Sequence, residues 1–363
     1  MIIIYFLLFT STTAFIFLPQ FLALLASPNQ QIPQSIINLI NLRLYLISFI
    51  QRRKFTGKIS KLYVYPIKSV SYISPSSWEL DEFGFKHDRQ YMLAFWDSTQ
   101  ALYQPYTQRN APKLSLVEID FNKEENWFKF TYPTDGGKLT SFKLPMNITQ
   151  DWIAQNSISD EHLKTDLWGV KFQSINIGKA LPDDFKIAMG LNRPGTTLLT
   201  SLSKKVISAH PQELKEQKST LFHDYYPLHF LSQTLVDELN HRISEQGSTR
   251  QVEAKQFRPN IVITDQKIDM DYWYDIKLNG KQIYIVQKTP RCNIGNVILS
   301  AGQFDKTNIV TRSLRQYRRI DTGDINGSFL GNYGIHKEYG YSVKVGDEIW
   351  LGRQRISSYE KLL

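Results

Sequence analysis

Beyond residue 54 the chain consists of short apolar stretches separated by Pro, Gly, Asn and Asp. The stretches are rich in β-branched and aromatic residues, which favour strands over helices. We predict strands over nine segments: Ile59–Tyr65, Tyr91–Phe95, Leu114–Phe121, Trp127–Tyr132, Val170–Ile177, Asn260–Thr264, Ile276–Leu278, Gln282–Gln287 and Glu348–Leu351. Many short strands with turn residues between them are typical of β-barrels.

Helical periodicity is confined to two segments. The stronger one, Leu228–Arg242, has leucines three and four residues apart and Ser232 near its start. The second covers Asp183–Leu191. We therefore predict an α+β fold that is mainly β, with one or two β-barrels and few helices. The boundary between two domains is predicted near Leu198–Lys205.

The first 50 residues differ from the rest of the chain. No charged side chain occurs before Arg43, and residues 1–26 are nearly all apolar. As a helix this stretch would span roughly 39 Å at about 1.5 Å per residue, enough for a bilayer core of about 30 Å. A second apolar run, Ile36–Ile50, ends in the basic cluster Gln51–Lys54, which favours a cytosolic C-terminal part. We predict a membrane anchor and linker over residues 1–50.

The alternative for this segment is a cleaved signal peptide and a secreted protein. Asn147 and Asn326 each begin an Asn-x-Ser/Thr acceptor for N-glycosylation. A sugar on either residue would exclude the cytosolic location.

Composition and charge exclude several classes of protein. With 42% hydrophobic and 21% charged residues, the 363-residue chain is globular and long enough for two domains or one large one. A net charge of +9 without a Lys/Arg block indicates an anionic cofactor, an acidic partner or a basic soluble face, and not nucleic-acid binding. Dinucleotide-fingerprint, Walker A, nucleophile-elbow and His-Glu-x-x-His motifs do not occur. We expect the seven histidines to be solvated or capping residues.

Four turns beside predicted strands concentrate cations and polar groups: Tyr65–Ser69, Gly84–Arg89, Phe257–Ile263 and Thr289–Gly295. In the first turn, a lysine and a serine beside a proline either bind a phosphate or end a strand. In the second, Arg89 begins a strand, and Asp88 is expected to form a surface ion pair with it.

The third turn is more informative. Arg258 precedes a proline, so its backbone is predicted to be extended, and Asn260 begins a buried strand. A guanidinium and an amide fixed at the mouth of a barrel suit a phosphate or a pterin-like heterocycle.

The fourth turn contains the single cysteine, Cys292, which excludes a disulfide framework, a Cys-rich zinc site and a cysteine-ligated iron–sulfur cluster. Cys292 follows a predicted strand and lies beside Arg291. A neighbouring cation favours the thiolate, the form that binds metals or acts as a nucleophile. A filler cysteine would sit more often among aliphatic residues within a strand, so this placement favours a function over an inert thiol.

Taken in series, these segments resemble the MOSC-domain family, and above all its mitochondrial amidoxime-reducing component branch. The resemblance extends from about Gly57 to Leu351. It depends on the order and spacing of short motifs: Tyr65–Ser69, Gly84–Arg89, Thr107–Pro112, Phe222–Pro227, Leu235–Asn240, Phe257–Asn260, Arg291-Cys292, Phe329–Tyr333 and Val345–Asp347. The resemblance implies a membrane anchor and linker over 1–50, a MOSC N-terminal β-barrel domain over 51–200 and a MOSC domain over 201–363.

The resemblance also implies a molybdenum cofactor, Mo-molybdopterin, with the thiolate of Cys292 as the protein ligand of the metal and the catalytic residue. The residues that match the family's pterin- and phosphate-binding positions are Lys68, Ser69, Arg89, Arg258, Asn260, Arg291 and Tyr333. The implied activity is reduction of N-hydroxylated compounds such as amidoximes, hydroxamic acids and hydroxylamines. Cytochrome b5 and its NADH-dependent reductase would supply the electrons.

The resemblance places the chain at the mitochondrial outer membrane, with the endoplasmic reticulum as the alternative. The sequence departs from the family pattern after the cysteine, over Asn293–Gln303, and at Tyr225-Tyr226, where the animal branch has small hydroxyl residues. A different class of function stays open, namely a non-catalytic, membrane-tethered module that carries the cofactor or sulfur.

Overall fold

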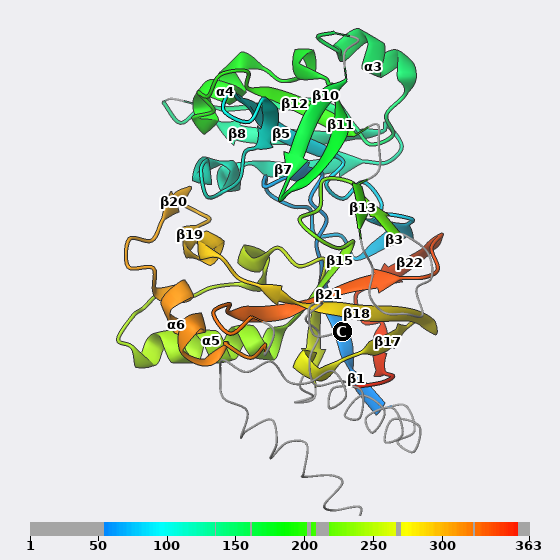
Figure 1. Cartoon of the computed structure of the whole chain (residues 1–363), viewed down its shortest axis with the longest axis vertical. Helices are drawn as coiled ribbons and strands as arrows, with labels where there is room; N and C mark the ends of the chain where they lie inside the picture. Colours follow the sequence, from blue (N-terminus) through cyan, green and yellow to red (C-terminus); the bar gives the residue numbers. More distant parts are fainter. Residues whose placement is uncertain are drawn as a thin grey trace, which may run out of the picture.

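The structure is a computed structural model that describes residues 54–134, 136–159, 162–201, 205–207, 218–265, 270–321 and 324–354. Two lobes lie one above the other (Figure 1). The predicted membrane anchor and linker, residues 1–50, lies outside the described residues. In the part of the chain that is described, no helix has both the length and the apolar character needed to cross a membrane.

The lower lobe is built around a closed barrel. Its strands follow the order β1 (Lys54–Leu62), β16 (Ile261–Asp265), β15 (Leu228–Ser232), β21 (Phe329–His336), β18 (Lys281–Pro290), β17 (Asp275–Leu278) and β23 (Glu348–Leu351). β23 pairs with β1 and closes the ring. β15 and β16 are parallel, with Phe230 opposite Ile261. The barrel therefore takes one strand from residues that precede the entire upper lobe.

The upper lobe contains a second barrel-like sheet. Its order is β12 (Thr197–Ser201), β11 (Val170–Asn176), β10 (Leu163–Leu167), β6 (Leu102–Pro105), β5 (Tyr91–Asp97) and β2 (Ile67–Lys68), and β12 also pairs with β5. A separate meander accompanies it, formed by β7 (Glu118–Asn122), β8 (Trp127–Pro133) and β9 (Leu139–Pro145). The extra pairing of β12 with β5 turns the sheet back on itself.

Smaller elements complete the two lobes. A three-stranded sheet joins β22 (Tyr341–Lys344), β3 (Ser77–Asp81) and β4 (Gly84–Phe85), and two hairpins pair β13 (Lys205–Ile207) with β14 (Lys218–Thr220) and β19 (Val297–Ile298) with β20 (Gln303–Phe304). The α-helices among the described residues are α3 (Gln150–Asn156), α4 (Asp183–Met189), α5 (Gln233–Glu245) and α6 (Ile309–Tyr317). The predicted fold, mainly β with barrel-like sheets and few helices, is confirmed.

The stronger helix prediction was wrong over its first five residues. Residues 228–232 form β15, all five side chains are buried, and the helix α5 begins only after Ser232. β15 lies between β16 and β21. Its apolar residues are therefore buried on both faces of a strand in the barrel wall, and they do not form one face of a helix. Ser232 is the residue before the first helical turn, but its side chain makes no capping hydrogen bond.

One strand prediction also needs correction. Residues 112–116 form a 3₁₀ helix, η1 (Pro112–Leu116), and β7 begins at Glu118. Pro112 has no backbone N–H to give to a sheet and its fixed φ suits the first turn of a helix. The amide of Leu114 donates to the carbonyl of Ala111 at 3.1 Å, which closes that turn.

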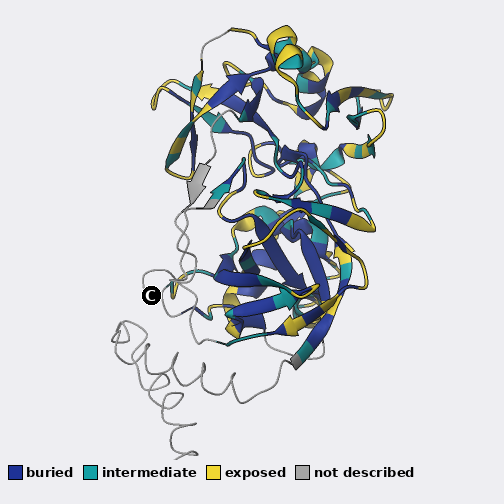
Figure 2. Cartoon of the chain, turned by 90° about the vertical axis from the view of Figure 1, so that its right-hand side faces the viewer, coloured by how far each residue is buried: buried dark blue, intermediate teal, exposed yellow. Residues whose placement is uncertain are grey.

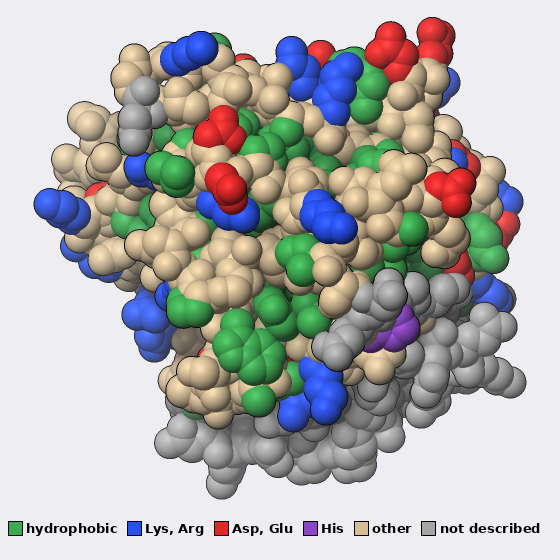
Figure 3. Space-filling model, turned by 90° about the horizontal axis from the view of Figure 1, so that it is seen from above, with side chains coloured by type: hydrophobic (Ala, Val, Ile, Leu, Met, Phe, Trp, Pro, Cys, Tyr) green, Lys and Arg blue, Asp and Glu red, His purple; other side chains and the backbone are tan. Residues whose placement is uncertain are grey.

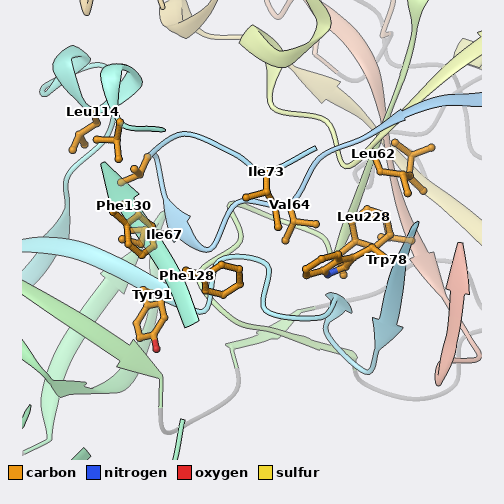
Figure 4. Packing of buried hydrophobic residues seen from close by; sticks show 14 of the residues in the cluster. Leu62, Val64, Ile67, Ile73, Trp78, Tyr91, Leu114, Phe128, Phe130 and Leu228 are labelled. Carbon is orange, nitrogen blue, oxygen red and sulfur yellow. The ribbon is translucent and has the colours of Figure 1, made fainter. Parts of the chain in front are cut away.

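A continuous cluster of buried hydrophobic side chains runs through both lobes. It includes Tyr91 and Phe130 in the upper lobe and Leu62 and Leu228 in the barrel (Figure 4). In Figure 2, much of the ribbon of the barrel and parts of the chain between the lobes are dark blue, the colour of buried residues. Because burial of this shared apolar surface stabilises both lobes together, it also holds the walls of the cavity between them in place.

Candidate active site

A cavity of about 350 Å³ is lined by residues of both lobes. All eight residues that the sequence placed in one site lie on its wall: Lys68, Ser69, Arg89, Arg258, Asn260, Arg291, Cys292 and Tyr333. They come from β2 and the residue that follows it, from the turns before β5, before β16 and after β18, and from β21. The structure thus brings the predicted residues together, while their individual roles remain predictions.

Asp88 is the buried centre of the arginine side of the cavity. One carboxylate oxygen accepts from the backbone N–H of Tyr65 at 2.7 Å. The other accepts from Arg89, from the amide of Asn260 at 2.9 Å and from the ring of His223 at 3.1 Å. Burial opposes ionisation, but Arg89 and His223 outweigh it and hold the pKa of Asp88 at about 2. The ion pair expected at the surface is therefore a buried one.

Asn260 braces this centre. Its side-chain oxygen accepts from the backbone N–H of His229 at 3.1 Å, and its NH₂ group donates to Asp88. Its backbone N–H donates to the carbonyl of His229 at 2.8 Å. With 1% of its surface exposed, Asn260 ties β15 to the turn that carries Arg89.

The ring of Tyr65 supports two arginines. The guanidinium carbons of Arg89 and Arg258 lie 4.5 Å and 4.2 Å from the ring centroid, within cation–π range. The hydroxyl of Tyr65 donates to the carbonyl of Pro259 at 3.0 Å. A single buried aromatic side chain therefore sets the positions of both cations.

Three of the site residues have left-handed backbones: φ is 66° at Ser69, 51° at Arg89 and 56° at Arg258. The prediction of an extended Arg258 was wrong. A 3₁₀ helix, η3 (Ala254–Phe257), ends at Arg258, whose N–H bonds to the carbonyl of Lys255 at 3.1 Å. Each such conformation costs a non-glycine residue about 1 kcal/mol, and such strain concentrates at functional sites.

Lys68 and Asp224 form an ion pair in the wall of the cavity. Lys68 is almost fully buried and also donates to the carbonyl of Phe222 at 3.0 Å. Burial lowers the pKa of Lys68, and Asp224 opposes that shift. The indole N–H of Trp168, which comes from the upper lobe, donates to the same carboxylate at 2.8 Å. The pair therefore joins the two lobes at the cavity.

His229 connects Arg258 to Arg291. Its Nδ1 lies 3.1 Å from the carbonyl of Arg258, and its Nε2 lies 2.5 Å from a terminal nitrogen of Arg291. A carbonyl only accepts and a guanidinium only donates, so Nδ1 carries the proton and the ring is neutral. Burial and the charge of Arg291 hold the pKa of His229 well below its usual value, which agrees with a neutral ring.

Arg291 fixes the loop that carries Cys292. Its guanidinium donates to the carbonyls of Leu330 at 2.8 Å and Phe257 at 3.0 Å, and its backbone N–H donates to Ser328 at 2.7 Å. Cys292 is exposed at the cavity and precedes a 3₁₀ helix, η5 (Asn293–Asn296). The thiol is thus presented to the cavity by a loop whose preceding residue is firmly held.

Tyr333 lies across the cavity wall beside His229, with 5.5 Å between the ring centroids. Burial raises the pKa of Tyr333, so its hydroxyl keeps the proton. The strand β21 can approach this closely because Gly331 has a φ of 87° and no side chain. A Cβ there would lie 2.5 Å from the carbonyl oxygen of Phe230.

The cavity fits an anionic ligand. Its wall has more cations than carboxylates: Lys68, Arg89, Arg109, Arg258 and Arg291 against Asp224 and Asp324. One terminal nitrogen of Arg258 is buried and has no hydrogen-bond partner among the described residues. Since a buried donor of this kind is costly when unpaired, it indicates a ligand that accepts from it. Phosphate and pterin oxygens are such acceptors.

No cluster of three or more His, Cys, Asp or Glu side chains in the described ranges could hold a metal ion. Cys292, the single cysteine of the sequence, lines the cavity.

The histidine prediction was wrong for four residues. His87, His223, His229 and His336 are buried, and each accepts or donates a hydrogen bond inside the protein. His223 and His229 belong to the site. His223 lies within the motif Phe222–Pro227, which was its available signal, whereas His229 is the second residue of β15 and lies outside that motif. Tyr65 and Trp168 were also missed as structural parts of the site.

Comparison with known proteins agrees with this architecture. Residues 56–185 match the model of the MOSC N-terminal beta barrel domain, and residues 217–350 match that of the MOSC domain. The chain is 25% identical over 309 residues to mitochondrial amidoxime reducing component 2 of Rattus norvegicus, covering 81% of this chain and 83% of the relative.

A second kind of relative is longer. The molybdenum cofactor sulfurase of Oryza sativa subsp. japonica is 25% identical over 312 residues, which cover 83% of this chain and 36% of the sulfurase. The chain therefore spans about a third of that relative's length. The crystal structure of the YUAD protein from Bacillus subtilis aligns over 84% of this chain and 98% of that one, at 10% identity and a TM-score of 0.37. With both domain models matched in order, the chain belongs to the MOSC-domain family.

Proposed function

We propose that the protein is a molybdenum-cofactor-dependent reductase of N-hydroxylated compounds such as amidoximes, hydroxamic acids and hydroxylamines. In this reaction the N–O bond breaks, the substrate takes up two electrons and two protons, and the oxygen leaves as water. Support comes from the relatives with a molybdenum-related role and from the composition of the cavity.

The observation that carries the proposal is the exposed thiol of Cys292 in a cavity with surplus positive charge. Soft thiolate is a suitable ligand for molybdenum, and arginine forks suit phosphate and pterin oxygens. When bound, the cofactor would supply the two electrons that are needed to break the N–O bond.

In this proposal, the residues of the chain bind and orient the cofactor and the substrate. Arg258 offers its unpaired terminal nitrogen, Arg89 is directed by Asp88, and Lys68 also lines the cavity. Tyr333 holds its proton and can donate a hydrogen bond into the cavity. His229 keeps the Arg258 and Arg291 turns at a fixed separation.

We further propose that cytochrome b5 and its NADH-dependent reductase supply the electrons, and that the protein is held at the mitochondrial outer membrane. The apolar first 26 residues and the names of the relatives support this location. Protease protection of isolated mitochondria tests it, because a cytosol-facing protein is digested without rupture of the outer membrane.

The test of the activity uses the full chain, expressed in a host that makes the cofactor. We expect about one molybdenum and one pterin per chain, and reduction of an amidoxime by reduced cytochrome b5. Cys292→Ser should abolish the reduction. Asn293→Ser, which changes the exposed neighbouring residue and keeps the thiol, is the matched control and should retain it. Absence of molybdenum from the wild type would contradict the proposal.

The second candidate is a non-catalytic module that carries the cofactor or sulfur, and the similarity to the sulfurases favours it. This function predicts bound cofactor without amidoxime reduction, or a persulfide on Cys292. Mass spectrometry of the intact chain distinguishes these two outcomes, since a persulfide adds the mass of one sulfur atom, and Cys292→Ser would lack it.

A further inference from the structure

Trp168 occupies an unusual position at the mouth of the cavity. It forms, with Gly169, the two-residue turn between β10 and β11, in which Leu167 pairs with Val170. Both turn residues have positive φ, 57° at Trp168 and 86° at Gly169, as in a type I′ turn. Asn-Gly is the favoured sequence for such a turn, and a bulky side chain in a left-handed conformation is a genuine outlier.

The side chain of Trp168 is held at the cavity and is not free to turn away. Its indole N–H donates to Asp224 at 2.8 Å, and the guanidinium carbon of Arg109 lies 4.7 Å from the ring centroid. Even so, 42% of Trp168 is exposed. A fixed aromatic surface therefore remains accessible beside the thiol-bearing cavity.

The opposite lobe contributes a second aromatic side chain. Tyr225 comes from the turn before β15, also lines the cavity and is 43% exposed. Its ring centroid is 5.9 Å from that of Tyr333. The cavity mouth thus has an exposed aromatic ring on each lobe, and flat rings of this kind bind planar conjugated groups by stacking.

We propose that Trp168 is a specificity-determining residue, on which the planar conjugated group of an N-hydroxylated substrate stacks while its N–O group faces Cys292. This inference rests on the proposed function. It assigns the chain a preference for aryl and heteroaryl substrates over small alkyl ones. The strained turn is explained by this role, because asparagine would satisfy the turn but would offer no stacking surface.

The test compares benzamidoxime with acetamidoxime, which differ in the group next to the reacting centre. The full chain with its cofactor should show a higher kcat/KM for benzamidoxime. In Trp168→Asn this preference should fall about fivefold, mainly through KM, because stacking is lost. Trp168→Phe should retain most of it. Trp350→Ala, which removes an exposed tryptophan on β23 outside the cavity, should leave the preference unchanged.

The melting temperature of the variant distinguishes this role of Trp168 from a purely structural one. Asparagine suits the turn, so Trp168→Asn should melt no lower than the wild type while it loses the aryl preference. An unchanged preference in Trp168→Asn would overturn the inference.

If the wild type reduces neither amidoxime, the proposed function fails, and calorimetry with the neutral amides benzamide and acetamide decides the role of Trp168. Tighter binding of benzamide that disappears in Trp168→Asn would support it. Equal binding of the two amides would refute it.

Discussion

Asp88 is the carboxylate at which the turn after β1, the turn before β5 and the start of β16 meet. It accepts hydrogen bonds from Tyr65, Arg89, His223 and Asn260, and no part of its surface is exposed. Removal of a buried charge from such a set leaves the opposite charge uncompensated, which costs more than the pair itself contributes.

Asp88→Asn should therefore lower the free energy of unfolding by about 3 kcal/mol, because Arg89 stays buried without its counter-charge. Chemical denaturation at pH 7 measures this. The control is Asp183→Asn, which removes an exposed carboxylate paired with Lys186 and should change the free energy by less than about 0.5 kcal/mol. Equal losses in the two variants would show that Asp88 has no special role.

The free energy of unfolding at low pH provides a second measurement on Asp88. The pKa of Asp88 is lowered from 3.8 to about 2, so its stabilisation is complete above about pH 4 and is lost as the pH falls through 2. At about 1.4 kcal/mol per pKa unit, the contribution is about 2 kcal/mol. The difference in stability between wild type and Asp88→Asn should shrink over that interval, and a constant difference would contradict the assignment.

At the scale of elements, a glycine places β4 against the segment that carries Asp224. Gly84 has a φ of 114°, and a Cβ on it would lie 2.6 Å from the carbonyl oxygen of Pro227. The turn between β3 and β4 therefore packs directly on the loop that leads from the cavity into β15.

Gly84→Ala should lower the free energy of unfolding by about 3 kcal/mol, because it adds a backbone clash to the cost of a left-handed conformation. The matched control is Gly136→Ala. Gly136 also has a positive φ, 90°, but nothing lies within 4 Å of its would-be Cβ, so only the conformational cost of about 1 kcal/mol remains. Denaturation of both variants isolates the contact with Pro227, and equal losses would exclude it.

Elements with local signals could be predicted from the sequence, and those set by distant partners could not. The segments Tyr91–Phe95 and Trp127–Tyr132 lie within β5 and β8, since their aromatic and β-branched residues favour strands in any sheet. The leucine spacing of Leu228–Arg242 also fits a buried strand followed by a helix, and only pairing with β16 and β21 decides between them.

The same distinction holds for the candidate site. Arg258, Arg291 and Cys292 stand in short motifs with turn residues around them, so their types and order point to a shared cavity. Trp168 and His229 lack such a signal. Trp168 meets Asp224 from the other lobe, and His229 meets Arg291 across the barrel, so their roles depend on tertiary contacts that local spacing does not encode.

At the scale of the whole molecule, the net charge of +9 raises the question of where the basic side chains gather. On the face seen in Figure 3, basic and acidic side chains of the described residues are interspersed, with hydrophobic side chains between them. The cavity wall has a positive surplus of its own, because its Lys and Arg side chains outnumber its carboxylates. The charge balance thus supports an anionic ligand in the site more strongly than it supports an acidic partner on that face.

The barrel pairs strands from near the beginning and near the end of the described residues, and this sets a condition for folding. β1 pairs with β16 on one side and with β23 on the other, through contacts such as Gly57 with Asp265 and Lys54 with Leu351. A fragment of residues 201–363 lacks β1, so β16 and β23 would each present an open edge, and unpaired edges promote aggregation.

We therefore expect the 201–363 fragment alone to be aggregated or without a cooperative thermal transition, because the barrel cannot close. Co-expression with residues 51–200 should restore a soluble complex, since β1 is then supplied in trans and the shared hydrophobic cluster can form. Size-exclusion chromatography and circular dichroism on both samples measure this. If the fragment alone melts cooperatively at the temperature of the full chain, β1 contributes nothing essential, and the MOSC domain folds without the strand that precedes the upper lobe.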